Sequence, residues 1–94
     1  MEKLEFEWDD AKAQKNAKKH GVTFNEAQSV FRDLLSSTFP DPDHSLEEDR
    51  LITIGTSDRN RLLVVSHTDR EGRTRIISAR KATRRERNAY EEEA

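Results

Sequence analysis

The segment Arg61–Arg87, RLLVVSHTDREGRTRIISARKATRRER, contains the clearest secondary-structure pattern of the chain. Two runs with apolar centres, 61–68 and 73–80, predict β-strands. The polar residues 69–72 between these runs predict a short turn. A link this short joins antiparallel neighbours, so we expect the two strands to form a hairpin.

Neighbouring patterns extend this hairpin on both sides. The apolar run 51–55 predicts a third strand, and a turn at 57–60 joins it to the hairpin in an antiparallel meander. After the hairpin, Thr83 and Glu86 have the spacing of a capping box and predict the start of a C-terminal helix. Tyr90 is the only large apolar anchor of that helix, so its docking should depend on this side chain.

Basic residues are concentrated in this part of the chain. From Arg59 to Arg87 there are ten lysines and arginines against three acidic residues, whereas residues 1–58 carry seven basic and thirteen acidic residues. The net charge of −2 therefore conceals a polarised chain. Because a guanidinium group binds phosphate through paired hydrogen bonds, an arginine-rich sheet predicts a surface that engages RNA.

The N-terminal part predicts one more strand and an amphipathic helix. Residues 4–8 alternate apolar and acidic side chains, which predicts a short edge strand with Leu4, Phe6 and Trp8 facing inward. Thr23 and Glu26 form a second capping box. The helix that follows has an apolar stripe made of Phe24, Ala27, Phe31 and Leu34, which is typical of a helix packed on a sheet.

A polar helix is expected between these two elements. It should span residues 10–20, with Asp9 as its N-cap and Gly21 as its C-cap. Its basic side chains share one side of the helix: Lys12, Lys15 and Lys19, with Asn16 and His20 beside them. Two interpretations stay open, a solvated lysine face and a face that contacts RNA.

These elements predict a single α+β domain over residues 1–94, with a small antiparallel sheet, two N-terminal helices and one C-terminal helix. A further short strand is expected at 36–39, before a loop that contains Pro40 and Pro42. The strands carry apolar residues on both faces, so both faces need covers. The N-terminal helices can cover one face, and the C-terminal helix or a partner protein must cover part of the other.

Composition excludes several classes of protein. Hydrophobic residues make up 32% and charged residues 38% of the 94 positions, and the apolar residues cluster into periodic segments instead of being diluted as in a disordered chain. There is no cysteine, so disulfides and thiolate metal sites are excluded. No apolar run approaches the length of a membrane span, and the N-terminus lacks a signal-peptide core. We therefore expect a soluble cytoplasmic protein without membrane contact.

Several motifs in this sequence are those of a known family: Phe6-x-Trp8-Asp9-x-x-Lys12, Asn16-x-x-Lys19-His20-Gly21-Val22-x-Phe24, Ala27-x-x-x-Phe31, Asp43-His44-x-x-x-Glu48-x-Arg50, Gly55, Arg75-Ile76-Ile77-Ser78-Ala79-Arg80, and the closing Ala82, Glu86, Arg87 and Tyr90. With these residues the chain resembles, over almost its whole length, the BrnT toxins, the ribonuclease half of a bacterial toxin–antitoxin pair and distant relatives of the RelE fold. The resemblance implies a RelE-like fold, metal-independent RNA cleavage without a cofactor, and neutralisation by a BrnA-type antitoxin. It also implies autoregulation of the operon, with operator DNA bound only through the toxin–antitoxin complex.

Metal-free cleavage of RNA needs a base for the 2′-OH proton, cationic groups for the phosphorane charge and an acid for the leaving 5′-oxygen. Arg80, at the end of its strand, is the predicted phosphate and transition-state group. The available acid and base groups are His44, Glu48 and His67. The candidates for contacts with the RNA backbone are Arg50, Arg61, Arg75, Lys12, Lys19 and His20, although a surface ion pair is an equal alternative for each arginine.

Other interpretations are weaker or remain open. His44 and Glu48 are spaced to ligate a metal on a helix, but the two prolines favour a loop and no third ligand is evident, so no metal site is predicted. The alternative to an endoribonuclease is a non-catalytic module whose arginine face binds RNA or an acidic protein. Loss of cleavage in a folded Arg80→Ala variant would separate the two.

Overall fold

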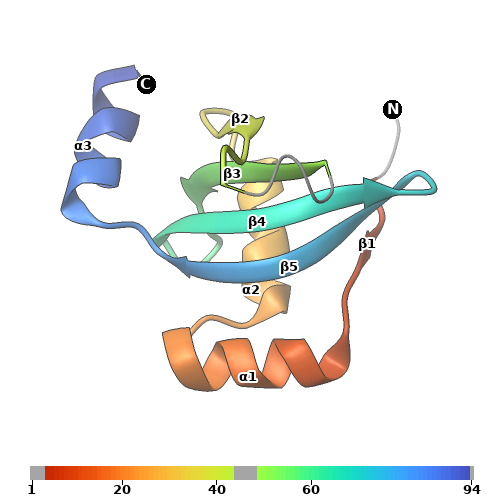
Figure 1. The fold of residues 1–94 in the computed structure, drawn as a ribbon. Coiled ribbons are helices and arrows are strands. Elements are labelled where there is room, and N and C mark those ends of the chain that lie inside the picture. Colours follow the sequence, from red (N-terminus) through yellow and green to blue (C-terminus); the bar gives the residue numbers. More distant parts are fainter. Residues whose placement is uncertain (1–3, 44–48, 94) are drawn as a thin grey trace.

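The computed structural model describes residues 4–43 and 49–93 (Figure 1). Along the chain the elements are β1 (Phe6–Glu7), α1 (Asp10–His20), α2 (Phe24–Ser29), a 3₁₀ turn (Val30–Arg32), β2 (Ser37–Pro40), β3 (Arg50–Thr56), β4 (Leu62–Arg70), β5 (Arg73–Lys81) and α3 (Arg84–Glu93). Within these residues the strands form one sheet in the order β1-β5-β4-β3-β2. The predicted α+β class is confirmed. The sheet is mixed, not purely antiparallel as expected, because β1 runs parallel to β5.

The β4–β5 hairpin turns more tightly than the sequence suggested. Its two turn residues, Glu71 and Gly72, both have positive φ angles, 51° and 82°. Positive φ at both central positions defines the type I′ turn, whose twist matches that of the two strands. The strands therefore extend to Arg70 and start again at Arg73, where a four-residue turn was expected.

The predicted helix caps are confirmed in their main features. The Asp9 carboxylate accepts a hydrogen bond from the backbone N–H of Lys12, and Gly21 ends α1 with a φ of 69°. At the start of α2 the Thr23 hydroxyl accepts from the backbone N–H of Glu26 at 3.0 Å. These caps satisfy backbone groups that the first and last turns of a helix cannot pair internally.

Two residues that were predicted to face inward are exposed, so these predictions are wrong. Leu34 is 99% exposed instead of continuing the stripe that begins with Phe24. The α-helix ends at Ser29 and tightens into a 3₁₀ turn, so the period of 3.6 residues no longer applies by residue 34. Leu4 is also exposed, since it precedes the two residues of β1 that pair with β5.

Both faces of the sheet are partly covered, as expected. On one face, α1 and α2 enclose a core of Val22, Phe24, Ala27 and Val30 against Leu63, Val65, Ile76 and Ala79 of β4 and β5. On the other face α3 packs Tyr90 against a smaller cluster of Ile54, Leu62 and Val64. Figure 1 shows α2 behind the sheet, α1 along β5, and α3 rising beside the face toward the viewer. Among the helices of the described residues, none is long and apolar enough to span a membrane.

Candidate nucleic-acid interface

The face of the sheet opposite α2, here called the open face, carries three of the predicted site arginines. Residues paired across strands share a face, so the register defines rows of neighbouring side chains. The rows are Ser37–Ile54–Val64–Arg80, Phe39–Ile52–Ser66–Ser78 and Arg50–Thr68–Arg75. A bulge at Ser66 and His67 shifts the register, which is why Arg75 and Ser78 can both lie on this face.

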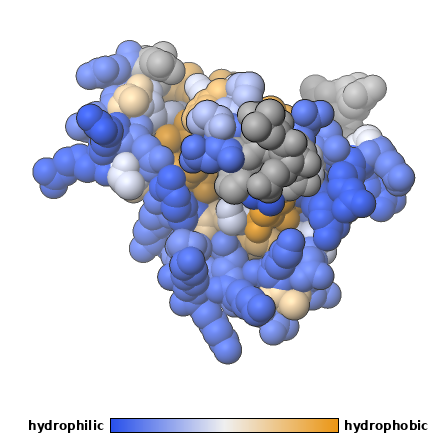
Figure 2. Space-filling view, in the orientation of Figure 1, coloured by the Kyte–Doolittle hydropathy of each residue, from blue (hydrophilic) through white to orange (hydrophobic). Residues whose placement is uncertain are grey.

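The open face is divided by polarity. Its β2–β3 side is apolar, with Phe39, Ile52 and Ile54. Its β4–β5 side presents the hydroxyls of Ser66 and Ser78 between the arginines. Figure 2 shows apolar residues exposed between α3 and the sheet, with hydrophilic residues around them. A surface of arginines and hydroxyls provides hydrogen-bond donors for phosphate and ribose oxygens.

Arg80 is held at the junction of β5 and α3 by Glu86. Its two terminal nitrogens donate to the two carboxylate oxygens at 2.8 and 2.9 Å, a bidentate pair. The same carboxylate accepts from the backbone N–H of Thr83 and so completes the capping box of α3. The Arg80 guanidinium lowers the pKa of Glu86 to about 2, and Glu86 in turn raises the pKa of Arg80. The Arg80 side chain remains 42% exposed and thus accessible to a ligand.

A cavity of about 220 Å³ lies next to this ion pair, between α3 and the open face. Its lining includes Ile54 and Val64 from the sheet and Glu86, Ala89 and Tyr90 from α3. The Tyr90 hydroxyl donates to Asp33 at 2.6 Å. Asp33 also accepts from the backbone N–H of Thr56 at 2.7 Å, so one carboxylate ties α3 to the end of β3.

The two other arginines of the open face differ in their surroundings. Arg75 donates from Nη1 to Glu7 of β1 at 2.8 Å, and both side chains are about three-quarters buried. This ion pair joins β1 to β5 at the positions where the two strands are in register. Arg50 lies at the start of β3, in the same row as Thr68 and Arg75.

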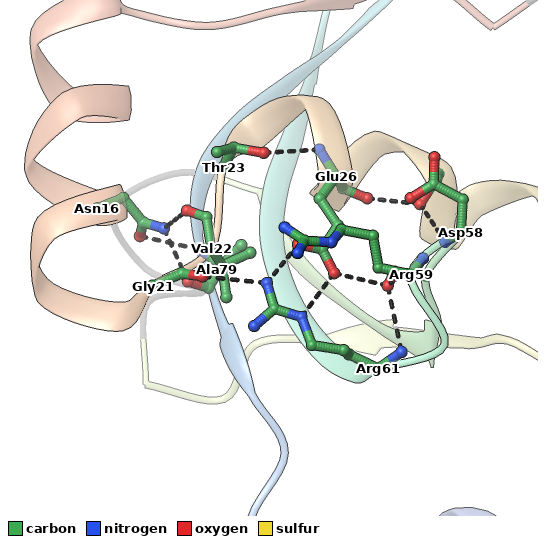
Figure 3. A network of polar contacts seen from close by, with 11 residues as sticks. Asn16, Gly21, Val22, Thr23, Glu26, Asp58, Arg59, Arg61 and Ala79 are labelled. Carbon is green, nitrogen blue, oxygen red and sulfur yellow. Dashed lines mark hydrogen bonds and ion pairs between the residues drawn. The ribbon is translucent and has the colours of Figure 1, made fainter.

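Arg61 lies on a different part of the molecule, in the polar network of Figure 3. Its Nε donates to the Glu26 carboxylate at 2.8 Å, a second bond joins Nη2 to the same group, and Nη2 also donates to the carbonyl of Gly21. The Glu26 side chain is only 3% exposed and also accepts from the Ser57 hydroxyl at 2.7 Å. The Arg61 hydrogen bond lowers the pKa of Glu26. This geometry accounts for Arg61 as a structural residue, and its RNA contact stays a prediction.

His67 faces the core and is only 3% exposed. Its Nε2 is 2.7 Å from the Thr53 hydroxyl, and its ring packs edge-on against Phe31 at a centroid distance of 4.9 Å. Burial lowers the pKa of this imidazole below its usual value. An RNA phosphate on the open face cannot reach it, so the geometry does not support the predicted catalytic role of His67.

The remaining predicted residues fall into two groups. Lys12, Lys19 and His20 lie on α1 and line a groove beside β5, on the edge of the sheet that adjoins the open face. His44 and Glu48 lie outside the described residues. The structure thus brings Arg50, Arg75 and Arg80 to one face and the α1 residues to its border. Arg61 and His67 lie away from the open face, although Arg61 bonds to Gly21 at the end of α1.

Sequence reasoning missed the partner of Arg80. Glu86 was predicted as a capping residue only, although it lies six positions after Arg80 and just beyond the end of the strand. A basic residue that closes a strand shortly before a capping-box carboxylate is a usable signal for such a pair. The hydroxyls of Ser66 and Ser78 were also missed, because their adjacency depends on strand register.

A small α+β domain with a basic, hydroxyl-bearing sheet face has the features of a nucleic-acid-binding protein. Residues 8–86 match the family described as the ribonuclease toxin BrnT of type II toxin–antitoxin systems, and the chain belongs to this family. The crystal structure of the Brucella abortus ribonuclease toxin BrnT is similar, with a TM-score of 0.68 and 26% sequence identity. The alignment covers 87% of this chain and 100% of that one. No match is found among curated proteins.

Proposed function

We propose that this protein is a metal-independent endoribonuclease that binds RNA across its open face, with the scissile phosphate at Arg80. The observation that carries the proposal is the placement of Arg50, Arg75 and Arg80 on one face of the sheet, beside two serine hydroxyls. The family description, a ribonuclease toxin, supports RNA as the substrate.

The proposed reaction is attack of a ribose 2′-oxygen on the adjacent phosphorus atom, with departure of the 5′-oxygen. It leaves a 2′,3′-cyclic phosphate on one product and a 5′-hydroxyl on the other. Arg80 stabilises the negative charge of the phosphorane by donating N–H groups to its oxygens. We assign the two proton transfers to His44 and Glu48, because the buried imidazole of His67 cannot contact the substrate.

The Arg80–Glu86 pair imposes one condition on this mechanism. Glu86 occupies one edge of the guanidinium, through both terminal nitrogens. Among the described residues, the Nε–H group of Arg80 has no acceptor. The edge of the guanidinium that carries Nε–H therefore remains for a phosphate oxygen. Glu86 also neutralises part of the charge that the phosphate would meet, so substrate binding competes with the ion pair.

The protein partner in this proposal is a BrnA-type antitoxin in the cytoplasm, which neutralises the toxin and forms the complex that binds operator DNA and autoregulates the operon. The apolar strip beside α3 supports a protein partner on the open face, since Phe39 is exposed there next to the cavity that Tyr90 lines. A segment that covers this strip would also block access to Arg80.

The direct test is incubation of the purified protein with end-labelled RNA, with and without EDTA, followed by mapping of the product ends. We expect cleavage that EDTA does not reduce and that leaves 2′,3′-cyclic phosphate and 5′-hydroxyl ends. Arg80→Ala should lose at least 100-fold in kcat, in line with the loss of one donor to a developing oxyanion. Circular dichroism must show that this variant is folded. Cleavage that stops in EDTA and returns with a divalent cation would contradict the mechanism.

A second candidate function is RNA binding without cleavage. The pairing of Arg75 with Glu7 and of Arg80 with Glu86 favours it, because paired arginines are less available to stabilise a transition state. Retention of RNA on a gel, with strong dependence on salt and no products after long incubation, would support this alternative.

A further inference from the structure

The groove between α1 and the edge of β5 has a distinct chemical character. It has a volume of about 330 Å³ and is lined by Lys12, Lys15, Lys19 and His20 of α1, with Ile77 and Ser78 of β5. The buried Asn16 also lines it. No acidic side chain of the described residues lines this groove. On the open face, in contrast, Arg75 and Arg80 each pair with a glutamate.

The groove exists because β1 is short. It pairs with β5 at Thr74 and Arg75, and among residues 4–43 and 49–93 no strand pairs with the rest of that edge. The helix α1 lies along this edge and is fixed there by Asn16, whose side chain bonds to the backbone N–H and C=O of Ala79 at 3.1 and 2.8 Å. The lysines are thereby held on a helix that is fixed to the strand.

The groove and the open face share one residue. Ser78 lines the groove and also lies in the row of Ser66 on the open face, two residues before Arg80. A strand of nucleic acid whose phosphate lies at Arg80 therefore meets the groove when it passes over Ser78. From Lys12 to Lys19 the helix advances by about 10 Å, so the three lysines can follow an extended backbone.

The side chains favour a phosphate backbone over a protein as the occupant. Protein interfaces are depleted of lysine and depend on aromatic and arginine anchors, whereas Ile77 is the only large apolar residue in the lining of this groove within the described chain. Lysines without base-reading partners are typical of contacts that position nucleic acid without selecting its sequence.

We propose that this groove holds the RNA strand beyond the scissile phosphate, as a subsite that contacts the backbone without sequence preference. The inference rests on the proposed function. It adds that efficient substrates are single strands long enough to reach from Arg80 to α1. The contacts with α1 are the reason for this minimum length.

The test measures binding of a fluorescent single-stranded RNA with 2′-O-methyl riboses, which cannot be cleaved, over a range of salt concentrations. In the variant Lys12→Gln/Lys15→Gln/Lys19→Gln, loss of three phosphate contacts should reduce the slope of log K against log salt by about 2. By the same relation, affinity at 0.1 M salt should fall by about 100-fold. Lys15→Gln and Lys18→Gln form a matched pair, since both remove one charge from α1 but only Lys15 lines the groove.

We expect Lys15→Gln to lose affinity for this RNA and Lys18→Gln to change the affinity little. Both variants should cleave an RNA too short to reach the groove as the wild-type protein does. Equal effects of the two single substitutions would show a general charge effect and overturn the subsite. An unchanged salt slope in the triple variant, or a loss of affinity for an acidic protein partner but not for RNA, would also overturn it. If the wild-type protein neither binds nor cleaves RNA, the proposed function itself fails, which is a different result.

Discussion

A reciprocal pair of hydrogen bonds joins Asn16 to Ala79, on the part of β5 that does not pair with β1. The Asn16 side-chain amide donates to the Ala79 carbonyl at 2.8 Å and accepts from the Ala79 N–H at 3.1 Å. The same amide nitrogen donates to the carbonyl of Val22 at 3.0 Å. One side chain therefore satisfies the edge of β5, fixes α1 beside it and closes the turn that leads to α2.

Asn16→Ala should lower the free energy of unfolding by about 2–4 kcal/mol, because it leaves three backbone groups without partners in a buried site. Chemical denaturation monitored by circular dichroism measures this change. Asn88→Ala, at an exposed position of α3, is the control and should stay within about 0.5 kcal/mol of wild type. An Asn16→Ala protein as stable as the control would show that water replaces all three bonds.

Arg61→Ala should act on stability and not on RNA. It leaves the Glu26 carboxylate buried without its cation, and removal of one partner of a buried ion pair costs about 3–5 kcal/mol. The partial exposure of Arg61 places the expected loss at the lower end of this range. Because Glu26 has a lowered pKa, the stabilisation that it provides is present above the unfolded-state pKa of about 4.5 and is lost as the pH falls through the folded-state pKa.

The measurement for Arg61→Ala combines denaturation with the salt dependence of RNA binding. We expect reduced stability with an unaltered salt slope. A slope reduced by about 0.7, with little loss of stability, would instead mean that Arg61 contacts a phosphate.

Glu86→Gln should separate the two roles of Glu86, which neutralises the charge of Arg80 and caps α3. Glutamine can keep the capping box with Thr83, but it removes the negative charge that Arg80 meets. Affinity for the non-cleavable RNA should rise by about 5-fold at 0.1 M salt, as expected for one additional cationic contact. The kcat of cleavage should fall, because the guanidinium is no longer held by two hydrogen bonds. Weaker RNA binding in a folded Glu86→Gln protein would contradict the competition between Glu86 and phosphate.

His67 should make the domain less stable in mildly acidic solution. Burial lowers the pKa of its imidazole in the folded state, whereas the unfolded chain binds the proton near pH 6.5. Asp69 opposes this shift by its charge, Thr53 bonds to Nε2, and Phe31 packs against the ring. Nδ1 is buried without a hydrogen-bond partner among the described residues. Stability should therefore fall as the pH drops below about 6.5, by up to about 1.4 kcal/mol between pH 7.5 and 5.5.

Thermal and chemical unfolding at these two pH values check this expectation. His67→Gln should show a smaller change over the same interval, because it removes the buried imidazole. An equal pH dependence in wild type and His67→Gln would assign the effect to other groups.

The fold could be predicted where local chemistry decides it. Helix caps such as Asp9 and Thr83 and the apolar runs of β3, β4 and β5 depend on neighbouring residues, and these elements were correctly predicted. The bulge that interrupts the alternation of β5 was not predicted. The parallel pairing of β1 with β5 depends on contacts across most of the chain and was not predicted. The shift to a 3₁₀ turn, which exposes Leu34, was not predicted either, because no local sequence pattern indicates it.

The candidate site shows the same division. Arg50, Arg75 and Arg80 were predicted from residue type, and their common face follows from the strand register. The structural roles of Arg61 and His67 depend on partners 35 and 14 positions away, Glu26 and Thr53, which sequence reasoning could not pair with them. Burial and partner choice, not residue type, therefore distinguish a structural cation or imidazole from a functional one.

Tyr90→Phe should loosen α3 without unfolding the sheet. The hydroxyl of Tyr90 donates to Asp33, and one hydrogen bond to a charged group contributes about 1.5–3 kcal/mol. The aromatic ring stays and can still pack on Ile54 and Val64, so the loss should appear in local opening of α3 more than in global stability. Hydrogen exchange of α3 amides should accelerate, whereas amides of β4 should keep their protection. Asn88→Ala, also on α3, should leave both unchanged. Equal acceleration in α3 and β4 would mean that this helix is part of the global folding unit and not a separately opening element beside Arg80.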